Sequence, residues 1–267
     1  MAKEYPQGIG PAFRERVIAA RALLKDREEK LRSGVSPYPY IDGFHFDVGS
    51  PRFEELGKIQ LTIVKHIREL AGNASIKRPV VYLDIGGGFG VSSIAIAIFL
   101  SDLVSQGKVV LIVSNLEFLP DRTNVSKLLR DDNMRVFLEN NMHLVQYIKT
   151  DIGHIPNRTI NVKNKRIKLS GNLDVVHEYN ALTHSTTPDR DYSILGRSLS
   201  PWGSLILDST DPYPYLSVPD NLRPAIAASF EIGINNLRVM SLRESRLDYY
   251  YVFQREQAPN ITYASQG

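Results

Sequence analysis

The apolar positions of this chain fall into short runs with the length and β-branched content of buried strands. Longer amphipathic or polar segments separate them, so strands and helices alternate, which predicts a parallel sheet with helices on both faces. Two further runs near the end are too close together for a helical crossover and are predicted to pair antiparallel. The seven runs are Val80–Leu83, Val109–Val113, Leu144–Ile148, Leu173–Val176, Ser204–Leu207, Leu237–Leu242 and Tyr249–Phe253.

The segment before the first strand is predicted to be helical. Apolar residues recur every three or four positions in Pro11–Leu31 and again in Arg52–Leu70, where they would form one buried stripe. We therefore expect an N-terminal helical extension or cap over residues 1–78, a main domain over 79–256 and a flexible tail over 257–267.

A glycine-rich stretch organises the main domain. Asp84 ends the first predicted strand, four glycines follow within six residues, and Val91–Leu103 is an apolar helix. A strand, a glycine turn and a helix N-terminus form a nucleotide site, because glycines let the ligand approach the main chain. The fingerprint of dinucleotide sites would place glycine or alanine where Val91 stands, which disfavours NAD without removing it as an alternative.

The spacing Asp84-x-Gly86-x-Gly88-x-Gly90 resembles motif I of the class I S-adenosylmethionine (SAM)-dependent methyltransferases. Leu173–His184 resembles the segment that comprises their fourth strand and the residues after it. Ile194–Leu207 resembles their proline–glycine turn before the fifth strand, with Trp202 in place of one glycine. The resemblance covers about residues 79–253. It implies an α/β, doubly wound, mostly parallel seven-stranded sheet with a terminal antiparallel strand.

The resemblance also implies which residues bind the cofactor, SAM, and its product S-adenosylhomocysteine. The glycine turn would pass under the amino-acid part, and Asp84 would help to hold the ammonium group. Glu117 would contact the ribose, since a carboxylate can accept two hydrogen bonds, and Asn115 is the alternative for this contact. Asp151 with Ile152 would meet the adenine, although Asp151 is also suited to be a helix N-cap. The implied cofactor residues are Asp84, Gly86, Gly87, Gly88, Gly90, Asn115, Glu117, Asp151 and Ile152.

Methyl transfer from a sulfonium needs a general base only when the acceptor must lose a proton. His184 is one candidate base, by resemblance to small-molecule O-methyltransferases, and His177, Glu178 and His45 are rivals. Two PYPY loops and the loop between the predicted N-terminal helices would line the acceptor pocket, unless their rings only pack at the loop bases. The predicted substrate-binding residues are Tyr38, Tyr40, Phe44, His45, Tyr213 and Tyr215.

Composition narrows the function classes. The 267 residues contain no cysteine, which excludes thiolate metal sites and cysteine nucleophiles. The net charge of +3 is too small to argue for nucleic acid. The basic segment 157–172 is predicted to be an inserted hairpin or an exposed loop, either solvated or in contact with an anionic substrate. No signal peptide or membrane span is visible, so a cytoplasmic protein is expected.

These features predict a SAM-dependent methyltransferase that transfers a methyl group to the oxygen or nitrogen of a small molecule, with no metal. No [DN]PP[YF] segment follows the fourth strand, which argues against methylation of DNA bases. An RNA methyltransferase and a non-catalytic SAM-fold binding module remain alternatives. The oligomeric state stays open, a homodimer included.

Overall fold

The computed structural model of the chain describes residues 56–73, 78–115, 119, 132–178, 188–208, 237–243, 249–255 and 261. The helix predicted over residues 11–31 and both PYPY loops lie outside these residues. So do the tail, apart from Ile261, and most of the predicted N-terminal extension. The domain boundaries at residues 78 and 256 therefore remain predictions.

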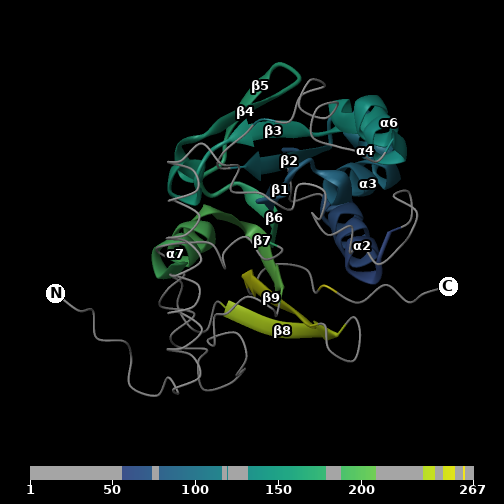
Figure 1. Ribbon diagram of the computed structural model, residues 1–267. Helices are drawn as coiled ribbons and strands as arrows, with labels where there is room; N and C mark the ends of the chain where they lie inside the picture. Colours follow the sequence, from purple (N-terminus) through teal and green to yellow (C-terminus); the bar gives the residue numbers. More distant parts are fainter. Residues whose placement is uncertain are drawn as a thin grey trace, which may run out of the picture.

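A seven-stranded sheet forms the centre of the fold, in the order β3-β2-β1-β6-β7-β9-β8. All neighbouring pairs are parallel except those of β9, which runs antiparallel to both β7 and β8. The predicted doubly wound sheet with its terminal antiparallel pair is confirmed (Figure 1). The strands are β1 (Val80–Ile85), β2 (Val109–Asn115), β3 (Gln146–Lys149), β6 (Leu173–Glu178), β7 (Leu199–Asp208), β8 (Leu237–Arg243) and β9 (Tyr249–Arg255).

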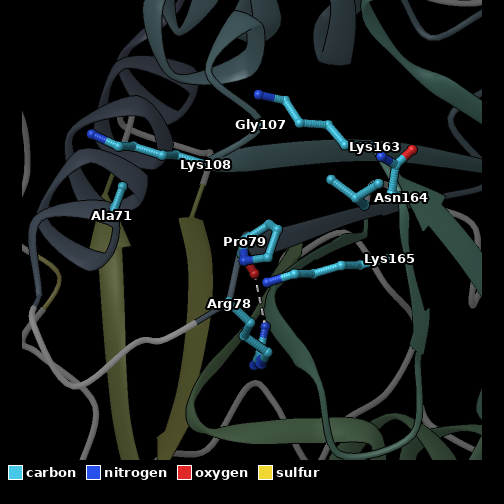
Figure 2. A pocket seen from close by; sticks show the side chains of 9 residues that line it. Ala71, Arg78, Pro79, Gly107, Lys108, Lys163, Asn164 and Lys165 are labelled. Carbon is cyan, nitrogen blue, oxygen red and sulfur yellow. Dashed lines mark hydrogen bonds between the residues drawn. The ribbon is translucent and has the colours of Figure 1, made fainter.

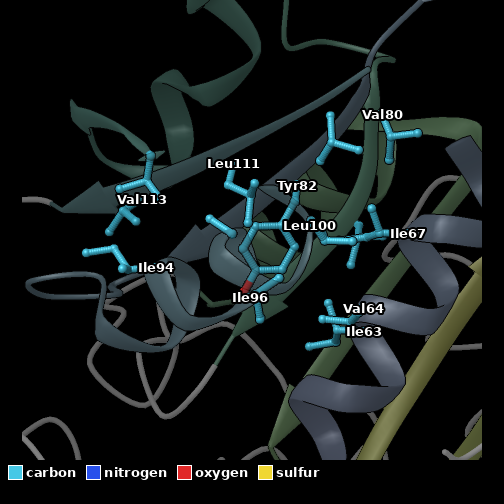
Figure 3. Packing of buried hydrophobic residues seen from close by; sticks show 14 of the residues in the cluster. Ile63, Val64, Ile67, Val80, Tyr82, Ile94, Ile96, Leu100, Leu111 and Val113 are labelled. Carbon is cyan, nitrogen blue, oxygen red and sulfur yellow. The ribbon is translucent and has the colours of Figure 1, made fainter. Parts of the chain in front are cut away.

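Helices cover one face of this sheet. They are α2 (Lys58–Gly72), α3 (Val91–Phe99), the short α4 (Ser101–Ser105) and α6 (Asp132–Asn141), followed by the 3-10 turn η2 (Met142–Leu144). Figure 3 shows Tyr82 of β1 packed against Ile96 of α3 and against Leu100, which follows α3. Ile63 and Ile67 of α2 lie nearby in the same cluster. Because successive strand residues point to opposite faces, alternate residues of β1 and β2 supply this layer.

The opposite face is covered by α7 (Pro188–Ser198), the 3-10 helix η3 (Ile152–Asn157) and a two-stranded hairpin of β4 (Thr159–Val162) and β5 (Lys165–Lys168). Ile160, Val162 and Ile167 of the hairpin pack against Val81 and Leu83 of β1 in one buried cluster. Of the two alternatives predicted for the basic segment, a hairpin or an exposed loop, the structure has the hairpin, which takes a place that a crossover helix often fills in parallel sheets.

A buried carboxylate ties the start of β1 to β6 and β7. Asp174 is fully buried and accepts two hydrogen bonds from Arg78, at 2.7 and 2.8 Å. It also accepts one from the Val81 N–H at 2.8 Å and one from the Ser200 hydroxyl at 2.6 Å. Both carboxylate oxygens are therefore satisfied, which is what makes a buried charge tolerable.

Several element bounds differ from the predicted ones. The helix predicted over Val91–Leu103 is interrupted at Leu100. Strand β7 begins five residues earlier than predicted, because residues 200–203, expected as a turn, form an irregular part of the strand where the register with β6 shifts. In the described part of the chain, no helix is long and apolar enough to cross a membrane.

Candidate cofactor site

The sheet reverses its winding between β1 and β6, and such a switch point leaves a crevice at the carboxyl ends of the strands where ligands bind in open α/β sheets. The chain passes from β1 outward through β2 to β3, and then returns to place β6 on the other side of β1. Asp84 pairs in register with His177, and Ile85 pairs with Glu178. The glycine turn that follows Ile85 therefore lies at this point.

The backbone of the turn requires glycine. Gly86, Gly88 and Gly90 have φ angles of +66°, +56° and +76°, a left-handed region that costs residues with a side chain. The Gly86 N–H donates to the Ser114 carbonyl at 2.8 Å, and the Gly90 N–H donates to the Gly87 carbonyl at 2.7 Å. Helix α3 begins at the next residue, Val91, so its first N–H groups lie beside the turn.

Two side chains from neighbouring strands fix the tip of the turn. Asn115, the last residue of β2, donates to the Gly88 carbonyl at 2.8 Å and accepts from the Gly88 N–H at 2.9 Å. Tyr147 of β3 donates its hydroxyl to the Phe89 carbonyl at 2.7 Å. Burial raises the pKa of Tyr147, so the hydroxyl keeps its proton. Side chains of β2 and β3 therefore support this conformation of the turn.

Asp84 lies directly beneath the turn. Its side chain is buried and accepts a hydrogen bond from the Ser93 hydroxyl of α3 at 2.6 Å. A Cβ added at Gly87 would lie 2.5 Å from Asp84 Oδ2, so only glycine fits above the carboxyl group. Burial raises the pKa of Asp84 to about 7, and the hydrogen bond from Ser93 opposes part of that shift.

The two predicted catalytic residues of β6 are buried at the switch point. His177 Nδ1 lies 3.3 Å from the Tyr82 hydroxyl and 3.9 Å from Asp84 Oδ1. Burial lowers the pKa of His177 to about 4, so its imidazole is neutral at pH 7. Glu178 is fully buried, and as the next strand residue it points to the opposite face of the sheet. Their catalytic roles stay predictions.

Asp151 follows β3 and is the N-cap of η3. Its carboxylate accepts from the His154 N–H at 2.9 Å and lies 2.7 Å from His154 Nδ1. Of the two roles considered for Asp151, the N-cap is present in the structure, and the adenine contact stays a prediction. The neighbouring Ile152 packs at the edge of the hydrophobic cluster that contains α7 and the hairpin.

The remaining predicted site residues lie outside the described residues. They are the candidate base His184, the candidate ribose residue Glu117 and the predicted substrate residues Tyr38, Tyr40, Phe44, His45, Tyr213 and Tyr215. Conversely, no feature of the sequence points to Ser93 or Tyr147, because neither belongs to a motif and both reach the turn only through the fold. Within the described residues, no cluster of three His, Asp or Glu could hold a metal ion.

No protein-family model matches the chain, and no curated protein sequence matches it. Solved structures do match. The CurJ carbon methyltransferase is 16% identical with a TM-score of 0.48, covering 93% of this chain and 72% of that one. The DszA carbon methyltransferase is 11% identical with a TM-score of 0.48, covering 92% and 67%.

A third match is the 1,6-didemethyltoxoflavin-N1-methyltransferase of Burkholderia thailandensis, crystallised with 1,6-didemethyltoxoflavin and S-adenosylhomocysteine. It is 13% identical with a TM-score of 0.44, and the match covers 94% of this chain and 92% of that one. These likenesses concern overall shape, so what the chain binds must be argued from its own residues.

Proposed function

We propose that this protein is a SAM-dependent methyltransferase whose acceptor is a small molecule. The observation that carries the proposal is the glycine turn at the switch point, which side chains of β2 and β3 hold above the buried Asp84. Main-chain groups that a ligand can approach closely, with a carboxyl group beneath them, suit an amino-acid moiety that carries an ammonium group.

The strand order favours SAM over NAD as the ligand. The common dinucleotide fold has the order 3-2-1-4-5-6. Here β9 is inserted antiparallel between β7 and β8. The fingerprint of that fold also wants glycine or alanine where this chain has Val91, the first residue of α3. SAM has no pyrophosphate, so its binding does not require that third glycine.

The predicted cofactor residues would divide the contacts with SAM between them. Gly86, Gly88 and Gly90 would lie along the amino-acid part, and Asp84 would face the ammonium group, whose positive charge would lower the pKa of the carboxyl group. Both amide atoms of Asn115 already bond to Gly88, which favours Glu117 for the ribose. Asp151 and Ile152, after β3, would contact the adenine.

When bound, SAM supplies a methyl group on a sulfonium, which is already an activated leaving group. The chain would then contribute mainly by positioning the acceptor, an effect worth up to roughly 7–11 kcal/mol. An acceptor hydroxyl would also need a base, and His184, His177 and Glu178 remain the candidates. Of these, His177 is neutral at pH 7, but the burial that lowers its pKa to about 4 also makes it a weaker base than an exposed histidine.

Acceptor binding would fall to the loops that carry Tyr38, Tyr40, Phe44, His45, Tyr213 and Tyr215. The absence of cysteine and the small net charge favour a small molecule over cytosine C5 or RNA. The RNA methyltransferase and the non-catalytic binding module remain the competing proposals.

A thermal-shift titration with SAM, S-adenosylhomocysteine and NAD tests the proposal. At a concentration of 100 Kd, a ligand of the folded state adds about 2.7 kcal/mol to stability. For a chain of this size that corresponds to roughly 5–10 °C in Tm.

Asn115→Ala should weaken the response to both sulfur ligands, because it releases Gly88. Asn141→Ala is the matched control, since Asn141 bonds to the Phe137 carbonyl of α6 at 2.8 Å, away from the turn.

A shift with both sulfur ligands and none with NAD supports the proposal. A shift with NAD alone overturns it. If SAM binds but no acceptor from a small-molecule panel yields S-adenosylhomocysteine, the non-catalytic reading gains, and an RNA substrate becomes the next one to test.

A further inference from the structure

A cavity of about 460 Å³ lies at the edge of the sheet opposite to the glycine turn. It opens where β1 and β2 begin, between the end of α2 and the turn of the β4–β5 hairpin (Figure 2). Strand β1 separates it from the glycine turn by six residues, or about 20 Å. Its nine lining residues are Ala71, Arg78, Pro79, Gly107, Lys108, Val162, Lys163, Asn164 and Lys165.

Four of these nine residues are cationic and none is acidic. Arg78 is balanced by the buried Asp174, and Lys163 donates to the Gln106 carbonyl at 2.6 Å. The ion pairs of the described residues include neither Lys108 nor Lys165. Figure 2 shows Lys165 reaching from the hairpin toward Pro79 and Arg78, while Lys108 extends toward Ala71. Within the described residues, two cations without an ion-pair partner therefore border one cavity from two sides.

The hairpin concentrates the positive charge of the whole chain. The segment between Asp151 and Asp174, which contains the hairpin, carries five Lys or Arg residues and no Asp or Glu. The complete chain has 32 basic and 29 acidic residues. Without this segment, 27 basic and 29 acidic residues remain, and their net charge is −2. Two of the five basic residues of this segment, Lys163 and Lys165, line the cavity.

The backbone is shaped to hold these side chains. Gly107 ends α4 with φ +70°, and its N–H bonds to the Val104 carbonyl while that of Lys108 bonds to the Leu103 carbonyl. A Cβ at Gly107 would lie 2.5 Å from Lys163 Cε, so the Lys163 stem rests on this glycine. Lys163 itself has φ +52°, an uncommon value for a residue with a side chain.

We infer that this cavity is a second binding site, for a small molecule that carries two or more phosphate groups. Lysine amines act as point charges that suit phosphate oxygens, and the cavity has the volume of a small-ligand pocket. Cationic residues that precede β1, precede β2 and form the hairpin turn border this one hollow, which favours a compact polyanion over the backbone of a nucleic acid. The site lies too far from the glycine turn to hold a methyl acceptor.

Isothermal titration of the full chain with tripolyphosphate, at about 0.15 M salt, tests this inference. Lys108→Ala and Lys165→Ala should each weaken binding by about tenfold or more, since each removes a charge-assisted contact. Lys168→Ala is the matched control on the same hairpin. It lies three residues beyond Lys165, on the other face of β5, and should leave the affinity within about twofold because screening weakens distant exposed charges.

Titrations with ATP and adenosine identify the source of the phosphate. Tighter binding of ATP than of tripolyphosphate would indicate a nucleotide, and equal binding would indicate recognition of the phosphates alone. Either result supports the site, provided that adenosine does not bind. S-adenosylhomocysteine affinity should be the same in all variants, which separates this site from the proposed cofactor site.

Three results would overturn the inference. One is no heat of binding with tripolyphosphate or ATP. Another is an equal loss of affinity in Lys168→Ala, which would mean diffuse attraction to the hairpin. The third is a single-stranded RNA that displaces tripolyphosphate and binds more tightly as its length grows, which would make this face a nucleic-acid surface.

Discussion

The buried carboxyl group beneath the glycine turn should make stability depend on pH with an identifiable sign. Burial raises the pKa of Asp84 from 3.8 to about 7. Between about pH 4 and pH 7 the folded protein therefore holds a proton that the unfolded chain has lost. In that range stability falls as pH rises, by about 4 kcal/mol in total, because one pKa unit corresponds to about 1.4 kcal/mol.

Asp84→Asn replaces the carboxyl group with a neutral amide of similar shape and removes this titration. The free energy of unfolding of Asp84→Asn minus that of the wild type should rise by about 4 kcal/mol from pH 4 to pH 8. Urea unfolding followed by circular dichroism at several pH values measures this difference. Asp102→Asn is a surface control, since Asp102 is exposed and pairs with Arg68. A difference that stays constant with pH, or that falls as pH rises, would refute the account of Asp84.

Three further predictions concern stability. Asp174→Ala should cost about 3–5 kcal/mol in urea unfolding, because it leaves the Arg78 charge without its buried partner, whereas Asp102→Ala should change little. Gly87→Ala should lower the free energy of unfolding by about 1–3 kcal/mol, since the added Cβ would meet Asp84 and Val113. Gly72→Ala is the control and should not destabilise the protein, because nothing lies within 4 Å of its Cβ position. Equal losses in the two variants would contradict the packing argument. Burial lowers the pKa of both His66 and His177 to about 4, so each contributes stability that is lost as pH falls from about 6.5 to 4. NMR should find both imidazoles neutral at pH 5, and protonation near pH 6.5 would contradict their burial.

The strands were the most predictable part of the fold, because every residue of β1, β2 and β6 is buried and most of these residues are apolar. The ends of those strands were less predictable. Asn115 and Glu178 are polar, yet they continue the ladder at the switch point, where neighbouring strands supply partners for their main chains. A hydrophobic pattern cannot detect residues that are held by pairing instead of by apolar burial.

The candidate site divides in the same way. The glycine turn was predictable, since its left-handed backbone requires glycines at fixed positions, and these are visible in the sequence. The groups that hold it were not. Tyr147 lies 58 residues from Phe89, and its hydrogen bond depends on β3 lying beside β2. Asn115 was predicted as a possible ribose contact, and only the fold reveals that it bonds to Gly88.

The central claim is that the glycine turn binds SAM, and amide NMR of the turn tests it most directly. On addition of S-adenosylhomocysteine to ¹⁵N-labelled protein, the N–H resonances of Gly86, Gly88 and Gly90 should shift and saturate. Those of Gly107 and Gly171 should stay in place, because neither glycine lies in the turn. Saturable shifts at Gly107 alone, or no shifts at a millimolar concentration of the ligand, would contradict the claim.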